Sequence, residues 1–406
     1  MAFVLFVTRW NIEAAVHLIE VTAKLPGIRL GLITGESIKY LPESARAKLA
    51  GYAEVSDVLD TAQLLAAART LSAEHGRIER IFGIWEYLQV PIAEVREALG
   101  IEGMGVEAAR NFRDKARMKD RWRAAGLPCA RHRLVKDEAE ALRFAQEVGY
   151  PVVVKPPAGM AARSTFRAQE PAALREAVQQ AMKSAGDAAL IEEQLTGQEG
   201  SLEAVSLGGK VLWQSLSRYF LHMLNFLERP EEPYRVLLPR EMPTPERDEI
   251  CRLAPRALQV LGMETGICHL EWFLRPDGSV ALSEVAARPP GGQISTLISH
   301  AHDADFLLAW VRLLLFGSFE FPARRYAAGV ICLRGQGPGH VQSVTGLEQA
   351  EDEFGELIAE ARLPKINQPA AEGYEGEGYI ILRHPETAVV EQGLRRLGEL
   401  IRVKMA

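Results

Sequence analysis

The chain has 406 residues, of which 48% are apolar and 25% charged, as expected for a folded protein with a sizeable core. Its formal net charge of -6 provides no general basic field, so we expect no nucleic-acid partner. The four cysteines are far apart and form no Cys-x-x-Cys pair, which argues against a zinc site or a disulfide framework. The cysteines read as reduced thiols, which predicts a cytoplasmic location. We predict no membrane segment, because the most apolar predicted helix, Phe306–Phe316, is too short to span a bilayer.

The first part of the chain, residues 1–108, alternates between strand and helix patterns. Phe3–Val7, Leu30–Thr34 and Ile78–Ile84 read as strands and are separated by helical segments. This alternation predicts an α/β domain with a parallel sheet. A dinucleotide-binding domain would place a Gly-x-Gly-x-x-Gly turn after the first strand, but the chain has Thr8-Arg-Trp-Asn11 there. We therefore expect no dinucleotide site in this domain.

The middle of the chain, residues 109–318, has an α+β pattern, and residues 319–406 read as a small mixed domain. Gly208-Gly209 is a strong hairpin signal between two apolar strands. The predicted helices of the middle region are Asn111–Ala125, Glu138–Val148, Pro171–Ser184, Pro245–Leu261 and Phe306–Phe316, and the predicted strands are Arg131–Val135, Val152–Lys155, Ala189–Gln194, Ser201–Leu207 and Lys210–Leu216.

Two glutamates are predicted to lie on one face of a hairpin that turns at Arg275-Pro-Asp-Gly278. Pairing of Leu274 with Ser279 would put Glu284 diagonally across from Glu271, at roughly 7–8 Å. Carboxylates placed in this way can share one Mg²⁺. The alternative is two solvated glutamates on an exposed strand, and a shift of one residue in register would separate them onto opposite faces.

The sequence that follows, Val285-Ala-Ala-Arg-Pro-Pro-Gly-Gly292, completes the pattern E-x-x-x-R-P-x-G-G, and together with the preceding glutamate strand it resembles the ATP-grasp superfamily. The resemblance implies that Glu271 and Glu284 bind Mg²⁺, with Mn²⁺ as an alternative. It implies that Arg288 contacts phosphate or an acyl-phosphate, and that Gly291 and Gly292 lie near the substrate. It also implies an α/β and α+β architecture: an N-terminal domain at 1–108, an ATP-grasp core at 109–318 with a mobile lid at about 128–193, and a C-terminal domain at 319–406.

Positions further upstream match the nucleotide motifs of the family. Lys115 begins Lys-Ala-Arg-Met-Lys and resembles the first phosphate lysine, and Lys155 at the end of a Val-rich strand resembles the second. Two lysines from different elements can bind the phosphates of ATP together, and Lys155 is also predicted to act in catalysis. The resemblance further implies that the adenine amino group lies at Glu192, that backbone groups of Glu193 to Leu195 complete the adenine contacts, and that Glu199 accepts hydrogen bonds from the ribose hydroxyls. The loop that contains Gly159, Arg163 and Ser164 can donate backbone N–H groups to phosphate.

The reaction implied by the resemblance transfers the γ-phosphoryl group of ATP to a carboxylate, after which an amine displaces phosphate. The Ala-Ala-Arg-Pro-Pro-Gly wording and the overall length look most like L-amino-acid ligases, which implies small-molecule carboxylate and amine substrates and an amide product. His222, in the irregular segment Tyr219–Glu232, is a weaker candidate for a substrate contact. The resemblance is also compatible with a homodimer.

Two alternatives remain open on the sequence alone. One is a different ATP-grasp reaction, such as carboxylation through carboxyphosphate, although the chain lacks a biotin-carrying Ala-Met-Lys-Met motif. The other is a nucleotide-binding regulatory protein without catalysis, which is disfavoured because both lysines and both glutamates are present. The chain departs from the family pattern at Ala286, where many members have an asparagine that helps to bind a second metal ion.

Overall fold

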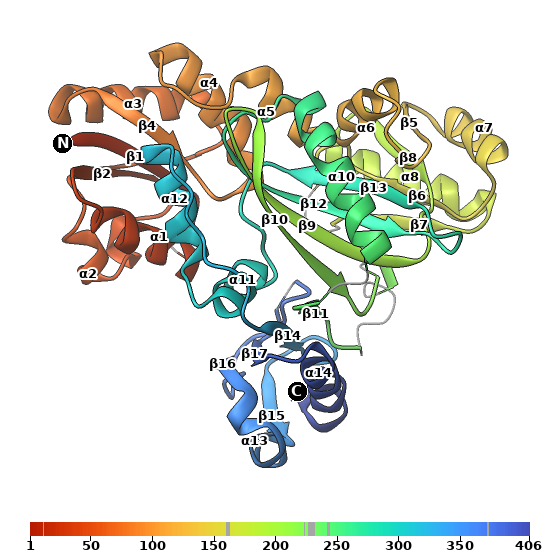
Figure 1. The fold of residues 1–406 in the computed structure, drawn as a ribbon. Helices are drawn as coiled ribbons and strands as arrows, with labels where there is room; N and C mark the ends of the chain where they lie inside the picture. The colour runs from red at the N-terminus through yellow and green to blue at the C-terminus, as the bar shows by residue number, and fades with distance from the viewer. Residues whose placement is uncertain (11, 160–162, 223, 226–231, 242–243, 372) are drawn as a thin grey trace.

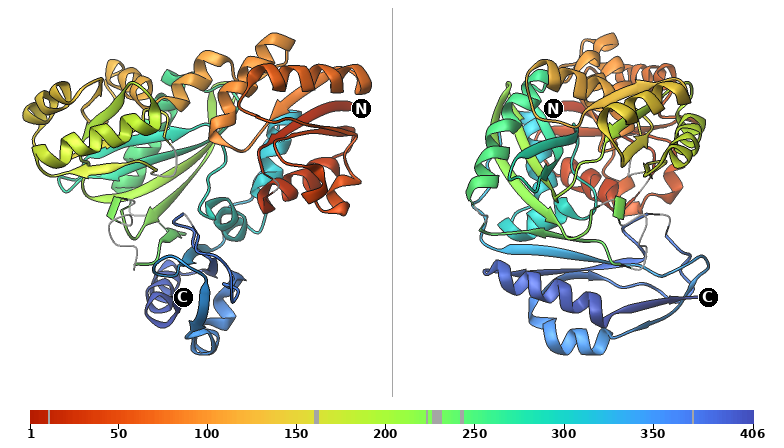
Figure 2. Two further views of the ribbon diagram at one scale, coloured as in Figure 1. Left: turned by 180° about the vertical axis from the view of Figure 1, so that it is seen from behind. Right: turned by 90° about the vertical axis from the view of Figure 1, so that its right-hand side faces the viewer.

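The computed structural model describes every residue except 11, 160–162, 223, 226–231, 242–243 and 372. A long antiparallel sheet runs through the centre of the molecule, with an N-terminal lobe and a lid lobe at its two sides and a C-terminal lobe below (Figure 1). Seen from behind, the N-terminal and lid lobes again lie at opposite ends of the molecule (Figure 2). The fold is mixed α/β, as predicted.

The N-terminal lobe contains a parallel sheet with strand order β3-β2-β1-β4, which confirms the predicted parallel sheet. Residues 3–8 of β1 are all buried, because helices cover both faces of this sheet. The elements of the lobe are β1 (Ala2–Thr8), α1 (Glu13–Ala23), β2 (Ile28–Thr34), η1 (Ile38–Tyr40), α2 (Glu43–Arg46), β3 (Gly51–Glu54), α3 (Thr61–His75), β4 (Ile78–Phe82), η2 (Glu86–Leu88) and α4 (Gln89–Leu99).

The central sheet has eight strands in the order β13-β12-β9-β10-β11-β14-β17-β16, so it continues into the C-terminal lobe. Gly208 and Gly209, both at positive φ, form the turn between β9 and β10 as predicted. The elements of this part are α5 (Val106–Arg113), α6 (Lys115–Ala124), β9 (Gln198–Leu207), β10 (Lys210–Tyr219), β11 (Arg235–Leu238), α10 (Thr244–Leu261), β12 (Gly266–Leu274), β13 (Val280–Ala286), α11 (Ile294–His302) and α12 (Phe306–Phe316).

The lid lobe is a smaller sheet with strand order β5-β8-β6-β7 and two helices packed on it. Each of its predicted helices and strands is present to within two residues at either end. The elements are β5 (His132–Val135), α7 (Glu138–Val148), β6 (Val152–Lys155), β7 (Phe166–Ala168), α8 (Pro171–Ala185) and β8 (Ala189–Glu193).

The C-terminal lobe packs α14 against β14 and β17 of the central sheet, and a two-stranded sheet of β15 and β18 lies beside them. Its elements are β14 (Ala327–Leu333), β15 (Val341–Thr345), α13 (Leu347–Phe354), η3 (Gly355–Leu357), β16 (Ile358–Arg362), β17 (Gly378–His384), α14 (Thr387–Leu400) and β18 (Arg402–Met405).

The prediction of one continuous helix over Asn111–Ala125 is wrong, because the chain turns at Asp114 and forms two helices. Asp114 is extended (φ -98°, ψ 110°), and its side chain accepts hydrogen bonds from the backbone N–H groups of Ala116 and Arg117. An aspartate in this arrangement is a favourable N-cap. Lys115 therefore occupies the first turn of α6, and its N–H donates to Pro157 O of the lid lobe at 2.9 Å.

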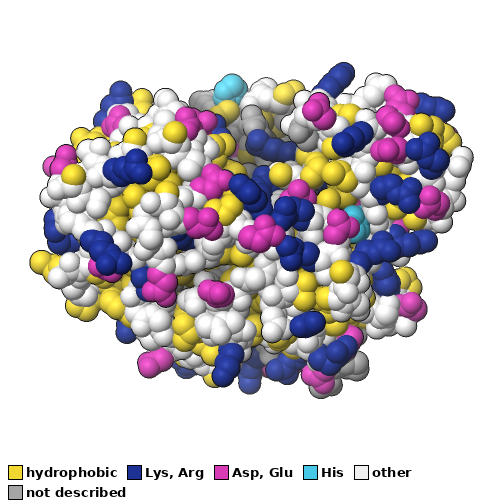
Figure 3. All heavy atoms as spheres, turned by 90° about the horizontal axis from the view of Figure 1, so that it is seen from above, with side chains coloured by type: hydrophobic (Ala, Val, Ile, Leu, Met, Phe, Trp, Pro, Cys, Tyr) yellow, Lys and Arg dark blue, Asp and Glu magenta, His cyan; other side chains and the backbone are white. Residues whose placement is uncertain are grey.

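In the described part of the chain, no helix is long and apolar enough to cross a bilayer. The four cysteines are free. On the face seen from above, Lys and Arg side chains are interspersed with Asp and Glu (Figure 3).

An ion pair joins α1 to the start of α12, which packs on the N-terminal lobe through Trp310 and Phe82. His17 Nε2 lies 2.8 Å from Asp305 Oδ2, and this hydrogen bond raises the pKa of His17 above its ordinary value of 6.5. A raised pKa of the folded state means that the stabilisation is fully present below the unfolded pKa and is lost as pH rises through the folded pKa. We therefore expect His17→Gln to lower the melting temperature more at about pH 5.5 than at about pH 8.5. Thermal unfolding of both proteins at the two pH values tests this, and an equal loss at both would contradict it.

Candidate active site

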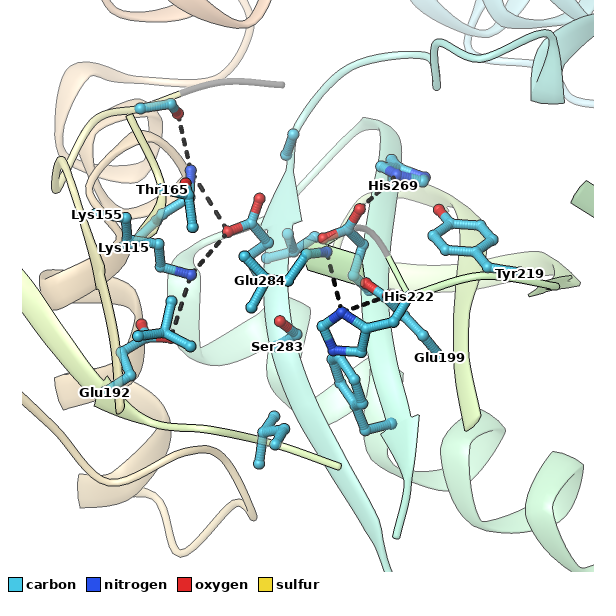
Figure 4. Close-up of a pocket in the computed structure, with 18 of the residues that line it drawn as sticks. Lys115, Lys155, Thr165, Glu192, Glu199, Tyr219, His222, His269, Ser283 and Glu284 are labelled. Carbon is cyan, nitrogen blue, oxygen red and sulfur yellow. Dashed lines mark hydrogen bonds and ion pairs between the residues drawn. The ribbon is translucent and has the colours of Figure 1, made fainter. Parts of the chain in front are cut away.

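One pocket of the described structure is lined by residues from the N-terminal lobe, the lid lobe, the central sheet and the C-terminal lobe, and Figure 4 shows part of this lining. The predicted site residues among its lining are Lys115, Lys155, Gly159, Glu192, Glu193, Leu195, Glu199, His222, Glu271, Glu284, Arg288, Gly291 and Gly292. The structure therefore brings together residues that are up to 177 positions apart, from Lys115 to Gly292.

The predicted pairing of Leu274 with Ser279 is wrong by one residue. Leu274 pairs with Val280, because Arg275 and Ser279 close the turn: the N–H of Arg275 donates to Ser279 O at 2.8 Å. Asp277 stabilises this turn by accepting from the N–H and the hydroxyl of Ser279. With this register and a regular ladder, the two glutamates would point to opposite faces.

A β-bulge at Ser283 restores the common face. The register shifts between Glu271 and Trp272: Trp272 pairs with Leu282 and Glu271 pairs with Glu284, so Ser283 is the extra residue. Glu271 therefore lies directly opposite Glu284 and not diagonally across from it. The sequence analysis anticipated the shared face but not the bulge that creates it.

Three lysines approach this hairpin from α6 and β6. Lys115 Nζ and Lys155 Nζ lie 3.5 and 3.4 Å from Glu284 Oε2. Lys155 Nζ also lies 3.1 Å from Glu192 Oε2, and Lys119 Nζ lies 2.9 Å from Glu192 Oε1. The two carboxylates thus offset part of the charge of the three lysines when no phosphate is bound.

These ion pairs shift the pKa values of their members. Burial alone would raise the pKa of Glu284, but Lys115 and Lys155 outweigh it and lower that pKa well below the ordinary value. Burial would likewise raise the pKa of Glu192, and Lys119 and Lys155 lower it instead. Burial would lower the pKa of Lys155, and the two carboxylates raise it above its ordinary value. All three groups therefore remain charged at neutral pH.

Two facing carboxylates fit a hard, small cation such as Mg²⁺. The described residues include no group of three or more His, Cys, Asp or Glu side chains that could bind a metal by themselves. A site with few carboxylates suits Mg²⁺, because this ion usually retains waters and takes phosphate oxygens as further ligands. The donors present at Glu271 and Glu284 thus fit a metal that arrives together with a nucleotide.

Behind Glu271 lies His269, which the sequence analysis did not single out. His269 Nδ1 lies 2.8 Å from the buried carboxylate of Glu203, and its Nε2 lies 3.6 Å from Glu271 Oε1. Burial alone would lower the pKa of His269, but its hydrogen bonds to these carboxylates raise that pKa to about 9. The resulting imidazolium can orient Glu271. The two-residue spacing of His269 and Glu271 on one strand was the available sequence signal.

Glu199 and His222 line the same pocket, with Glu199 on β9, the strand next to that of Glu271. Glu199 is 5% exposed, and its Oε2 lies 3.7 Å from His222 Nδ1, which accepts a hydrogen bond from the N–H of Leu224. Burial and the nearby Arg167 lower the pKa of His222 to about 4, so the ring is neutral at physiological pH. Since Nδ1 accepts, the proton lies on Nε2, which has no hydrogen-bond partner within the described structure. His222 is thus placed beside the predicted ribose acceptor; residues 223 and 226–231 of its segment lie outside the described residues.

The predicted adenine contacts are arranged along the end of β8 and the residues that follow it. Glu192, Glu193 and Leu195 all line the pocket. The N–H of Glu193 already donates to Arg131 O at 2.9 Å, and its carboxylate accepts from Arg131 Nε at 2.6 Å. Gln194, whose backbone falls within the predicted range, also lines the pocket, and its buried side-chain Oε1 has no hydrogen-bond partner in the described structure.

The predicted phosphate loop is placed only in part. Gly159 lines the pocket, and its carbonyl accepts from Lys115 Nζ at 2.9 Å. Residues 160–162 lie outside the described residues, and Arg163 and Ser164 do not line the pocket, whereas Thr165 does. The roles of Arg163 and Ser164 remain predictions.

Arg288 follows the hairpin of β12 and β13 and contacts the N-terminal lobe. Its Nη2 lies 3.1 Å from Glu86 Oε2, and its Nη1 donates to Pro289 O at 2.9 Å. Glu86, which the sequence analysis did not single out, is 7% exposed and also pairs with Arg113 at 3.2 Å. Both Nη atoms of Arg288 thus have partners, and Arg288 and Glu86 together line the pocket.

Gly292 ends the motif at φ +61°, and a Cβ there would lie 3.3 Å from the Tyr374 ring. Its N–H donates to Glu375 Oε1 at 2.9 Å, which connects the motif to the C-terminal lobe. Tyr374 of this lobe packs on Tyr234 with ring centroids 4.8 Å apart, and both rings line the pocket. The C-terminal lobe therefore contributes to the wall near Arg288.

Comparison with known proteins assigns the fold. Residues 114–202 match the family model of the carbamoyl-phosphate synthase L chain, ATP binding domain. Over its whole length the chain is similar to the crystal structure of an L-amino acid ligase from Bacillus licheniformis, with a TM-score of 0.80 at 18% identity, covering 100% of this chain and 99% of that one. An N5-carboxyaminoimidazole ribonucleotide synthetase from Thermotoga maritima has a TM-score of 0.72 at 16% identity and covers both chains completely. Residues 114–202 therefore match an ATP-binding domain of the ATP-grasp kind, and the whole chain shares the fold of these solved structures.

Sequence relatives place it near the ligases of this superfamily. The L-arginine-specific L-amino acid ligase of Bacillus subtilis is 24% identical over 209 residues, which is 50% of each chain. The chain thus matches about half the length of the curated relatives.

Proposed function

We propose that this chain is an ATP- and Mg²⁺-dependent ligase that joins the carboxylate of an amino acid to an amine through an acyl-phosphate. The observation that carries the proposal is the convergence of Lys115, Lys155 and the facing pair Glu271 and Glu284 in one pocket. Similarity to ligases that act on amino acids supports the substrate class.

Different residues of the pocket would bind the nucleotide and the metal. Lys115 and Lys155 would exchange their carboxylate partners for nucleotide phosphates, while Glu199 would accept hydrogen bonds from ribose. Glu271 and Glu284 would hold Mg²⁺, which neutralises phosphate charge during phosphoryl transfer. The same exchange frees Glu284 for the metal, so metal and phosphate binding should reinforce each other.

Arg288 would act on the group that receives the phosphate. Its planar fork can pair with two oxygens of the transferring phosphoryl group or the acyl-phosphate. The lid sheet contacts the same pocket through Lys155 and Glu192 and would exclude water, which otherwise hydrolyses such an intermediate. We assign no general base, because the attacking amine can lose its proton to solvent or phosphate.

Ala286 restricts the metal site. It occupies a pocket-lining position on β13 but has no oxygen to offer. A second metal ion would therefore depend on Glu284, phosphate oxygens and water, a ligand set that Mg²⁺ accepts.

The proposal can be tested by incubating the protein with ATP, Mg²⁺ and mixtures of amino acids. We expect ADP release that requires added amino acids, and product masses equal to two amino acids less one water by mass spectrometry. Release of ADP that depends on bicarbonate would instead favour carboxylation, in line with the fold similarity to the carboxyaminoimidazole ribonucleotide synthetase. ATP binding without any turnover would favour a regulatory role.

Arg288→Lys should lower turnover strongly although the charge is kept. Lys lacks the planar fork, and loss of one charged hydrogen bond costs roughly 1.5–3 kcal/mol, or about 10- to 150-fold in kcat/KM. The affinity for ATP should change much less, because Arg288 pairs with Glu86 and not with the predicted nucleotide residues. Steady-state kinetics and equilibrium ATP binding measure the two effects. If Arg288 only forms a structural ion pair with Glu86, Arg288→Lys will retain near-normal kinetics.

A further inference from the structure

Lys119 is a fully buried charge next to the site but outside its lining. It lies one turn after Lys115 on α6, and its side chain is 0% exposed. Its Nζ lies 2.9 Å from Glu192 Oε1 and donates to Ser283 O at 2.5 Å. A buried ammonium is costly unless it is paired and hydrogen-bonded, so these two contacts determine where it lies.

Lys119 donates to the carbonyl of Ser283, which is the bulge residue in the hairpin of β12 and β13. Ser283 has no partner in β12, and β13 is the edge strand of the central sheet, so no strand lies on its other side. Lys119 supplies a donor for this carbonyl. Without the bulge, Glu284 would move to the face opposite Glu271, because side chains alternate along a strand.

Residues close to Ser283 on β13 also form hydrogen bonds with α6 and the residues that follow it. The N–H of Leu282 donates to Pro128 O at 2.8 Å, and the N–H of Val285 contacts Met118 Sδ at 3.3 Å. The edge of β13 is thus covered by α6 and the residues that follow it. Lys119 differs from these neighbours because it also contacts Glu192 at the nucleotide end of the pocket.

We propose that Lys119 is a positioning residue for both the metal and the nucleotide. Through Ser283 it fixes the bulge that sets Glu284 opposite Glu271, and through Glu192 it fixes a carboxylate of the nucleotide end. One side chain therefore connects the two halves of the site. The inference rests on the Mg²⁺–ATP binding part of the proposed function and is independent of the substrates.

The test measures metal binding directly and needs no turnover. Mn²⁺ is titrated by electron paramagnetic resonance in the presence of a saturating, non-hydrolysable ATP analogue, and analogue binding without metal is measured by calorimetry. The variants are Lys119→Met, Glu192→Gln and the double variant, with Arg123→Met as a matched control at an exposed position of α6. We expect Lys119→Met to weaken Mn²⁺ binding about tenfold or more, since charged hydrogen bonds contribute on that scale.

The double variant distinguishes positioning from structural support. Lys119→Met leaves the buried carboxylate of Glu192 with one partner fewer. Glu192→Gln removes the charge of this carboxylate, so the double variant should be more thermally stable than Lys119→Met alone. It should still bind Mn²⁺ about tenfold more weakly than Glu192→Gln, because Ser283 O remains without its donor. This comparison also applies if Lys119→Met alone does not fold.

Mn²⁺ affinities within about threefold in both comparisons would overturn the inference and leave Lys119 as a structural ion. Such a result with normal wild-type binding would not affect the proposed ligase. A wild-type protein that binds neither the analogue nor Mn²⁺ would instead overturn the proposed function together with the inference. Arg123→Met should match the wild type in every measurement, and a comparable loss there would also count against a specific role of Lys119.

Discussion

Glu271→Gln and Glu284→Gln should each abolish turnover while the protein remains folded. Glu271 lies directly opposite Glu284, so both carboxylates can reach one Mg²⁺, and Ala286 offers no replacement oxygen. Glutamine keeps the size of the side chain but removes its negative charge, which Mg²⁺ requires for tight binding. Glu284→Gln should have a second effect, since it also removes a partner of Lys115 and Lys155. ADP release as a function of Mg²⁺ concentration measures the turnover and the Mg²⁺ dependence of both variants.

The control for these variants is Glu264→Gln, an exposed glutamate just before β12 that should behave like the wild type. Thermal unfolding establishes that the variants are folded. Normal turnover with normal Mg²⁺ dependence in either Glu271→Gln or Glu284→Gln would remove the metal site, and with it most of the support for catalysis.

Local patterns predict many elements of this fold, but not β3, β7 or the individual elements of the C-terminal lobe. Apolar periodicity and turn residues locate the strands of the N-terminal and lid lobes, because both signals act over a few residues. The break at Asp114 was missed, since the helical pattern continues across it and only the capping geometry shows that the aspartate ends one helix and begins the next. The order of the eight strands in the central sheet depends on contacts between distant segments, which periodicity does not report.

The site was predictable where a residue carries its own chemical signal. Lys155 ends a buried strand, and Glu271 and Glu284 flank a recognisable turn, so they could be singled out. Glu86 could not, because its role depends on contact with Arg288, which is 202 positions away. The bulge at Ser283 was also invisible in the sequence, since it results from the turn that closes at Ser279 and from contacts with α6.

Lys155→Ala should weaken ATP binding by about 10- to 150-fold, which corresponds to the roughly 1.5–3 kcal/mol of a charged hydrogen bond. Lys155 is buried at the end of β6 and lies within 3.4 Å of both Glu192 and Glu284. Its removal should not unfold the lid, because Lys119 still pairs with Glu192 and Lys115 still pairs with Glu284.

Calorimetric titration with an ATP analogue, with and without Mg²⁺, measures the expected loss, and Lys115→Ala should show a loss of similar size. Lys183→Ala, at an exposed position of α8 in the same lid, is the matched control. Lys155 contacts Glu284, so without Lys155 the phosphates would face this carboxylate with one positive charge fewer. The loss of ATP-analogue affinity in Lys155→Ala should therefore be larger without Mg²⁺, because no metal then neutralises the phosphates. Unchanged binding in both Lys115→Ala and Lys155→Ala would show that the phosphates do not lie between α6 and β6, and the nucleotide would have to be placed elsewhere in the molecule.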